Sequence, residues 1–193
     1  MNKVSSKSVF SNKALKALFI MNGIFVLAGS LLGPLYAVYV KSLDERIMSV
    51  SLSWAAFLLS TTVFTFIVSR MGDKIREKEY LLMAGYLIRS VVWFLYIFVG
   101  GVLDLVILQV MLGIGEALGT PSFDALFAEH LDKNKHISEY SDWKIISNGV
   151  LVLGTLLGGY IVSRYGFTYL FLAMSGLSLV AFFGILLKPR KLL

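Results

Sequence analysis

The chain has 193 residues, of which 57% are hydrophobic and 16% are charged, and its mean hydropathy is +0.77. A soluble domain of this size needs far more polar surface, so the composition excludes one and indicates a protein that lies in lipid. The net charge of +6 sits in short connectors between apolar runs, which favours membrane topology signals over nucleic-acid binding, and a sequence without cysteine excludes disulfides and thiolate metal sites.

Six apolar segments are long enough to cross a hydrocarbon core of about 30 Å, which takes about 20 helical residues. In chain order they cover residues 17–40, 47–69, 80–103, 105–128, 145–163 and 165–187. The first is too long for the apolar part of a signal peptide and lacks a small-residue cleavage site, so we expect it to be retained. The sequence therefore predicts an all-α membrane protein with a six-helix transmembrane domain at 17–187, between tails at 1–16 and 188–193.

Lysine and arginine are distributed unequally between the two sides of these segments. Fourteen of the 18 fall in the two tails and in the connectors after the second and fourth segments. The connectors on the other side hold only Lys41, Arg46 and Arg164, and Arg89 lies inside the third segment. Basic residues concentrate on the cytoplasmic side, so we predict a multi-pass protein of the plasma membrane with both termini in the cytoplasm.

The two halves of the chain share a series of short matches. GSLLGPLYAVYVKSLDER at 29–46 resembles GEALGTPSFDALFAEHLDKN at 115–134, since each has two glycines four residues apart, then a proline, then an aromatic run ending in Leu-Asp. The second and fifth segments both end in IVSR, and Trp54 and Trp143 lie near their starts. Three helices is an odd number, so the second copy must insert upside down. We predict two inverted three-helix repeats, an arrangement common in secondary transporters.

Three stretches carry a family resemblance. SRMGDKIREKEYLLMAGY at 69–86 follows a signature loop pattern through Asp73, Lys74 and Lys78, LQVMLGIGEALGTPSFDALFAEH at 108–130 has Gly-x-Gly followed by proline, and YGFTYLFLAMSGL at 165–177 matches a typical entry to a sixth helix. Together they resemble the N-terminal six-helix half of a major facilitator superfamily (MFS) transporter. The resemblance implies secondary active or facilitative transport of a small solute, with no cofactor and no enzymatic reaction.

The sequence also departs from that family pattern. Ser69 and Arg76 stand where glycines are usual in the loop, and Gln109 stands where the family often has an arginine, which weakens the case for proton coupling. The fifth segment lacks the proline of the antiporter signature, so we do not predict an antiporter. We expect its glycines, among them Gly154 and Gly158, to serve close helix packing.

Glu116 is the main candidate for a functional residue. An ionised carboxylate near the centre of a membrane helix costs at least about 2.5 kcal/mol, so it must be paired, protonated or in contact with water. Gln109, Glu116 and Thr120 follow at i, i+7 and i+11 and share one helix face. Either this face lines a cavity where Glu116 binds substrate or a coupling proton, or Glu116 forms a structural pair with Arg89, or both hold. The two residues differ in depth by only about 4–5 Å.

Other polar residues allow two interpretations each. Asn22 in the first segment binds solute or, as we favour, bonds to a neighbouring helix. Tyr36 and Tyr39 near the outer end are predicted to anchor at the membrane interface. Charged residues at the cytoplasmic side form either an inner gate, as the family loop suggests, or a solvated charge run. The candidates for that gate are Asp73, Lys74, Arg76, Lys78 and Asp124, near Glu129 and His130.

Six helices form only one wall of a transport cavity and would leave that polar wall facing lipid. We therefore expect the bilayer, an unknown small solute and a second six-helix unit as partners, the last supplied by a homodimer or by a separate chain. An inactive truncated transporter and a non-transporting membrane scaffold are the alternatives. We expect no metal and no nucleic acid, and no nucleophile–base arrangement indicates an enzyme.

Overall fold

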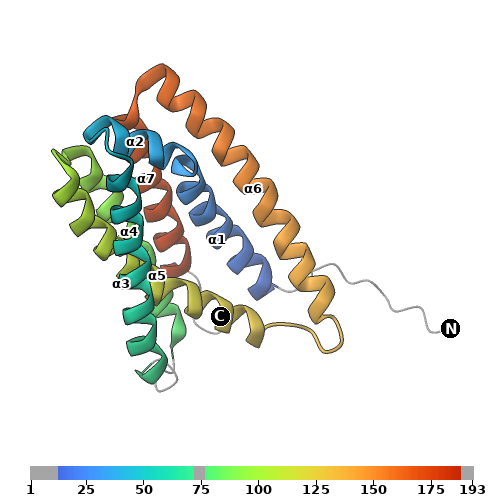
Figure 1. The fold of residues 1–193 in the computed structure, drawn as a ribbon. Helices are drawn as coiled ribbons and strands as arrows, with labels where there is room; N and C mark the ends of the chain where they lie inside the picture. The colour runs from blue at the N-terminus through green and yellow to red at the C-terminus, as the bar shows by residue number, and fades with distance from the viewer. Residues whose placement is uncertain (1–12, 72–76, 188–193) are drawn as a thin grey trace.

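The computed structural model describes residues 13–71 and 77–187, and helices joined by short connectors make up these residues (Figure 1). The elements are α1 (Lys13–Leu32), α2 (Leu35–Leu43), α3 (Ile47–Met71), α4 (Lys78–Leu95), the short 3₁₀ helix η3 (Tyr96–Phe98), α5 (Val102–Glu129), α6 (His136–Tyr165) and α7 (Phe167–Leu186). Within these two described ranges, six helices are long and apolar enough to cross a membrane. The prediction of an all-α protein with six spans is confirmed.

The first predicted segment is not one continuous helix. It divides into α1 and α2 at Gly33 and Pro34. Gly33 has a φ of +22°, a value that side chains disfavour, and Pro34 has no N–H to continue the helical hydrogen bonds. A turn hydrogen bond from the Tyr36 N–H to the Gly33 carbonyl, 3.2 Å long, closes the break. Hydropathy alone predicted an uninterrupted helix over 17–40, and that prediction is wrong at this turn.

Two other boundaries differ from the prediction. The third span ends at Phe98 rather than at 103, because Gly100 and Gly101 form a turn there and the Gly100 N–H donates to Asp104 Oδ2 at 3.1 Å. Helix α6 begins at His136 rather than near 145 and has 30 residues. At 1.5 Å per residue it is about 45 Å long, longer than the hydrocarbon core is thick, so its ends reach beyond the apolar layer.

The helices pack side by side in the order α3, α5, α4, α7, α1, α6. Figure 1 shows α6 at one edge of the bundle, beside α1. If each span of the first half of the chain is exchanged for its counterpart in the second half (α1 with α5, α3 with α6, α4 with α7), the same order results, read from the other end. Two inverted repeats are expected to show this symmetry. Helices α1 and α5 occupy equivalent places in the two repeats and touch each other only sparsely.

Glycines let neighbouring helices approach closely. A Cβ on Gly85 of α4 would lie 2.7 Å from Gly119 Cα of α5, and a Cβ on Gly158 of α6 would overlap the Leu31 carbonyl of α1. Both contacts fit the small-residue packing typical of membrane helices. Gly159, by contrast, has nothing within 4 Å of the same position. Packing therefore accounts for some of the fifth-span glycines and not for all of them.

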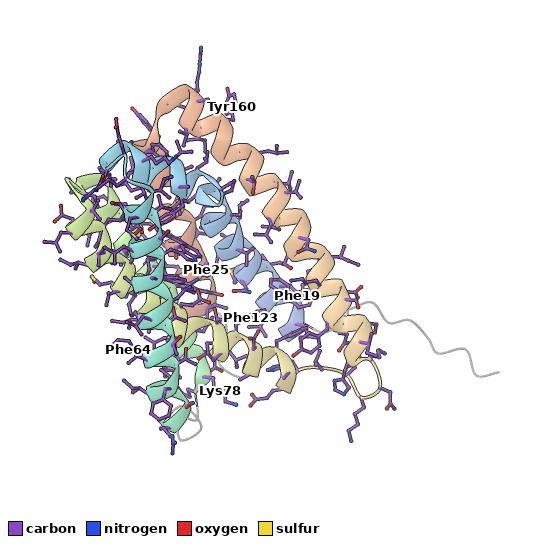
Figure 2. All side chains as sticks on the ribbon, in the orientation of Figure 1. Phe19, Phe25, Phe64, Lys78, Phe123 and Tyr160 are labelled. Carbon is purple, nitrogen blue, oxygen red and sulfur yellow. The ribbon has the colours of Figure 1, made fainter. Side chains whose placement is uncertain are left out.

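The two ends of the bundle differ in their content of lysine and arginine. The end where α4 and α6 begin holds Arg70, Lys78, Lys133, Lys135 and Lys144, and we call it the basic end. The opposite end holds α2. Figure 2 shows Lys78 at the lower, basic end and Tyr160 at the upper end of α6, with Phe25 and Phe123 between these levels in the bundle.

Candidate functional site

The two membrane-embedded charges Arg89 and Glu116 meet in the interior of the bundle. Arg89 Nη2 of α4 forms an ion pair with Glu116 Oε2 of α5, and Thr120 Oγ1 donates to Glu116 Oε1 at 2.5 Å. Helices α4 and α5 come close enough for this pair because Gly115 has no side chain, since a Cβ there would lie 3.0 Å from Arg89 Cγ. The ion pair between Glu116 and Arg89, one of the interpretations offered for Glu116, is therefore present in the structure.

Arg89 is held more tightly than Glu116. Its side chain is 12% exposed, against 28% for Glu116, and its Cζ lies 4.8 Å from the centre of the Phe25 ring. A guanidinium over an aromatic face gains a cation–π interaction, which is strongest where water is excluded. The carboxylate is thus the more accessible half of the pair.

Two cavities adjoin this ion pair where α1 and α5 scarcely touch. The α2-side cavity, of about 210 Å³, extends toward α2, and the basic-side cavity, of about 460 Å³, extends toward the basic end. Arg89, Glu116, Gly29 and Gly33 line both. A charged pair bordered by space on either side is positioned to meet a polar solute from both directions.

Gln109 lies in the wall of the α2-side cavity and is buried. Its Nε2 donates to the Tyr36 hydroxyl, which donates to Ser53 Oγ at 2.6 Å, and that hydroxyl donates to the Ser49 carbonyl at 2.8 Å. Because this chain of hydrogen bonds joins α5, α2 and α3, it fixes the outer half of the first span over the cavity. Gln109 and Thr120 adjoin different cavities, with Glu116 between them.

The prediction that Tyr36 and Tyr39 anchor at the membrane interface is wrong. Both are buried, and the Tyr39 hydroxyl donates to the Tyr96 carbonyl at 2.9 Å. Each tyrosine finds a hydrogen-bond partner inside the bundle because α2 lies across neighbouring helices instead of continuing α1.

Asn22 lies in the wall of the basic-side cavity and also joins two helices. Its Oδ1 accepts a 2.8 Å hydrogen bond from the Tyr86 hydroxyl of α4. A hydrogen bond to a neighbouring helix is the role that we favoured for Asn22 from the sequence.

Two of the gate residues predicted at the cytoplasmic side, Lys78 and Asp124, lie within the described residues. Lys78 forms an ion pair with Glu129 between the start of α4 and the end of α5. Asp124 instead lines the basic-side cavity, whereas Lys78 lines a different, smaller one. The remaining members, Asp73, Lys74 and Arg76, lie outside the described residues.

Aromatic residues that the sequence did not single out form much of the cavity walls. Trp93 and Tyr96 line the α2-side cavity together with Trp54, and Phe25 lines the basic-side cavity. The sequence does contain a signal for Trp93 and Tyr96. They follow Arg89 at i+4 and i+7, so they share a helix face with this charged residue. Trp54 and Phe25 have no such relation to a charged residue.

Comparison with known proteins identifies the family to which this architecture belongs. Residues 18–192 match the family model described as Major Facilitator Superfamily. The chain is 25% identical over 152 residues to the "Uncharacterized MFS-type transporter YitZ" of Bacillus subtilis (strain 168), and the match covers 77% of this chain and 90% of that protein. It is 28% identical over 171 residues to the "Multi-drug resistance efflux pump PmrA homolog" of Lactococcus lactis subsp. lactis (strain IL1403), covering 84% of this chain and 41% of that longer protein.

The family match agrees with the order of the helices, the inverted repeat and the loop and helix motifs noted in the sequence. It identifies an integral, multi-pass protein of a transporter family rather than an enzyme. This chain belongs to the Major Facilitator Superfamily and has the fold of a six-helix half of such a transporter.

Proposed function

We propose that this chain moves a small organic solute across the plasma membrane by alternately opening the two cavities beside Arg89 and Glu116. Family membership establishes transport in general. The observation that supports this site is the ion pair itself, which adjoins cavities extending toward opposite ends of the bundle. Both termini lie in the cytoplasm in this proposal, because the basic end carries the excess of lysine and arginine.

A second six-helix unit completes the cavity. Glu116 and Thr120 reach the cavities from the face where α1 and α5 scarcely touch, and lipid cannot satisfy these polar groups. A second copy in the same orientation, related by an axis along the membrane normal, would cover this face. The match that spans 90% of the Bacillus relative supports a carrier unit of this size, because that protein is close to this chain in length.

The solute that fits best is small and amphipathic. Trp54 and Trp93 offer aromatic faces beside the charged groups of Arg89 and Glu116. Such a wall binds an apolar ring together with a polar or charged group. The Lactococcus relative is named a multi-drug resistance efflux pump, which supports an organic compound rather than an inorganic ion.

Uptake by proteoliposomes that contain only the purified chain tests the proposal. Solutes from a panel of small aromatic amines and acids should accumulate, and Glu116→Gln should reduce this uptake at least tenfold. Asp142→Asn is the matched control, because Asp142 is exposed on α6 and outside the walls of both cavities.

If no solute of the panel moves, the transport proposal is wrong for this chain alone and a scaffold role gains support. If uptake by Glu116→Gln is normal, the ion pair is structural and the solute binds elsewhere.

A further inference from the structure

The basic-side cavity has a carboxylate in its wall that the described part of the chain leaves unpaired. Asp124 is exposed and lines this cavity, and it has no hydrogen-bond or ion-pair partner among the described residues. In the described wall the cation is Arg89, which is already paired with Glu116. The charges that line the cavity therefore leave one negative charge uncompensated.

The lysines of the basic end do not supply the missing cation. Lys78 is paired with Glu129, and Lys135 is paired with Asp132. Lys144 lines a separate cavity at the start of α6. A carboxylate that stays unpaired close to so many lysines attracts cations from outside the described chain, because its field is not cancelled by a neighbour.

The same cavity offers an aromatic face for such a cation. Trp143 of α6 is partly exposed, lines the cavity, and packs against Phe123, the residue before Asp124, with ring centres 5.1 Å apart. Tryptophan is the aromatic side chain that attracts cations most strongly. The described arginines that lie over aromatic rings are Arg70 and Arg89, and neither covers Trp143. The face of Trp143 is thus not used by a cation of the described chain.

The carboxylate lies between the basic end and the ion pair. Glu116, Thr120 and Asp124 follow at i, i+4 and i+8 on one face of α5 and all line the basic-side cavity. At 1.5 Å per residue, Asp124 is about 12 Å from Glu116 along the helix axis. A solute that enters from the basic end therefore meets Asp124 first, and it can bind there without breaking the pair of Glu116 with Arg89.

We propose that Asp124 and Trp143 form a cation-binding site in the outer part of the basic-side cavity, and that this site selects a small aromatic solute that carries an ammonium group. The ammonium group binds to the Asp124 carboxylate, and the face of Trp143 adds a cation–π interaction. The inference rests on the proposed transport function, since it names the charge class of the solute. A neutral or anionic solute of the same shape lacks both interactions.

Three probes with one phenethyl skeleton test this charge preference. At neutral pH phenethylamine is a cation, phenethyl alcohol is neutral and hydrocinnamate is an anion, and their binding to the purified full chain in detergent is measured by calorimetric titration. Phenethylamine should bind about tenfold more tightly than the other two, the lower end of the range for a hydrogen bond to a charged group. Asp124→Asn should remove this advantage without changing the affinity for phenethyl alcohol.

Two further variants serve as controls. Asp124→Glu keeps the charge and should keep most of the preference for phenethylamine. Asp142→Asn removes a negative charge from the exposed surface of α6, outside the cavity wall, and should keep all of it. Without a probe, Asp124→Asn should unfold at the wild-type temperature, because its carboxylate has no partner in the described part of the chain.

Several results would overturn the inference. These are equal affinities for the three probes, no binding of phenethylamine, and a preference that survives in Asp124→Asn. An equal loss of preference in Asp142→Asn would assign it to the overall charge of the protein instead. A lower unfolding temperature of Asp124→Asn, together with weaker binding of all three probes, would identify a structural residue.

Uptake of the same probes by proteoliposomes separates this inference from the proposed function. A wild-type chain that transports phenethyl alcohol or hydrocinnamate as well as phenethylamine overturns only the cation-binding site. A preference for phenethylamine that depends on Asp124, in a chain that transports none of the probes, supports the cation-binding site and overturns only the transport proposal.

Discussion

Arg89 and Glu116 depend on each other for their stability in the bundle. Each neutralises the other in a place where a lone charge costs several kcal/mol, and Arg89 is the more buried of the two. Removing the carboxylate therefore leaves a buried cation over the Phe25 ring, without the acidic partner that neutralised it. Removing the guanidinium leaves a carboxylate that still adjoins open space.

Glu116→Gln should consequently destabilise the folded chain by about 3 kcal/mol, and Arg89→Gln by less. The double variant should recover most of this loss, because no buried charge remains unpaired. Thermal unfolding in detergent measures all three. Additive losses in the double variant would show that the two residues are not energetically coupled.

Asp44 lies outside the membrane spans, and its contribution to the stability of the fold depends on pH. Hydrogen bonds from the Arg46 side chain, and then from the Arg46 backbone and Ser49, hold the pKa of Asp44 well below its usual value. A depressed pKa contributes stability above the unfolded-state value near 4, and that contribution is lost as the pH falls through the folded-state value.

Asp44→Asn should therefore lower the unfolding temperature at pH 6–7, by a small amount since the partner Arg46 is exposed, and the difference from wild type should shrink below about pH 4. Unfolding scans over this pH range measure it. A difference that stays constant down to pH 2 would contradict the charge-based explanation.

The charged part of the site could be predicted from the sequence, whereas its aromatic walls could not. Arg89 and Glu116 stand out because an ionised group within an apolar run has few acceptable environments. Trp54 and Phe25 look like ordinary lipid-facing residues in the same kind of run. Tyr36 was misjudged because tyrosines at an interface and tyrosines bonded inside a bundle have the same sequence context.

At the scale of the helices, contacts between glycine-bearing faces determine which elements pack together. Gly158 of α6 faces the Leu31 backbone of α1, and the neighbouring Gly159 faces open space. The two positions are adjacent in one helix and share helix propensity, so they form a matched pair for testing.

Gly158→Ala should lower stability by about 1–3 kcal/mol through overpacking, because helix α6 must move away from α1 to accept the methyl group. Gly159→Ala should be neutral or slightly stabilising, since alanine favours a helix over glycine. Unfolding temperature and folded yield in detergent distinguish them. Equal effects at both positions would rule out close α1–α6 contact at Gly158.

Hydropathy predicted the existence of every span but not where each helix starts and ends. The excess length of α6 was missed because its first turns contain polar residues such as Asp142 and Lys144, which an apolar window rejects although helical backbone tolerates them. The turn at Gly33 was missed for the opposite reason. Its neighbours are apolar, so the window continued across a glycine–proline pair that ends a helix.

At the scale of the whole molecule, the proposed partner can be detected with a single introduced cysteine, because the natural sequence has none. Val26 lies on α1 in the wall of the basic-side cavity, and Val180 is exposed on α7. In a parallel homodimer that closes the α1–α5 face, α1 lies near the two-fold axis, so copies of residue 26 approach each other across the cavity, and copies of residue 180 face lipid.

Val26→Cys should therefore form cross-linked dimers in membranes with a bifunctional maleimide about 10 Å long, and Val180→Cys should not. Denaturing gel electrophoresis measures both. Cross-linking of Val26→Cys to a different polypeptide would identify a separate partner chain, and a chain that stays monomeric in both variants would rule out the homodimer.

The aligned repeats place the charged pair in only one of the two copies. Glu116 follows Gly115 in α5, and its counterpart in α1 is Ser30, which follows Gly29 and is a neutral residue against Gly154 of α6. Two identical inverted copies would make the inward-open and outward-open forms equal in energy. A charge carried by one copy alone removes that degeneracy, so the proposed carrier is expected to have a preferred resting orientation, and we propose that Glu116 contributes to this preference.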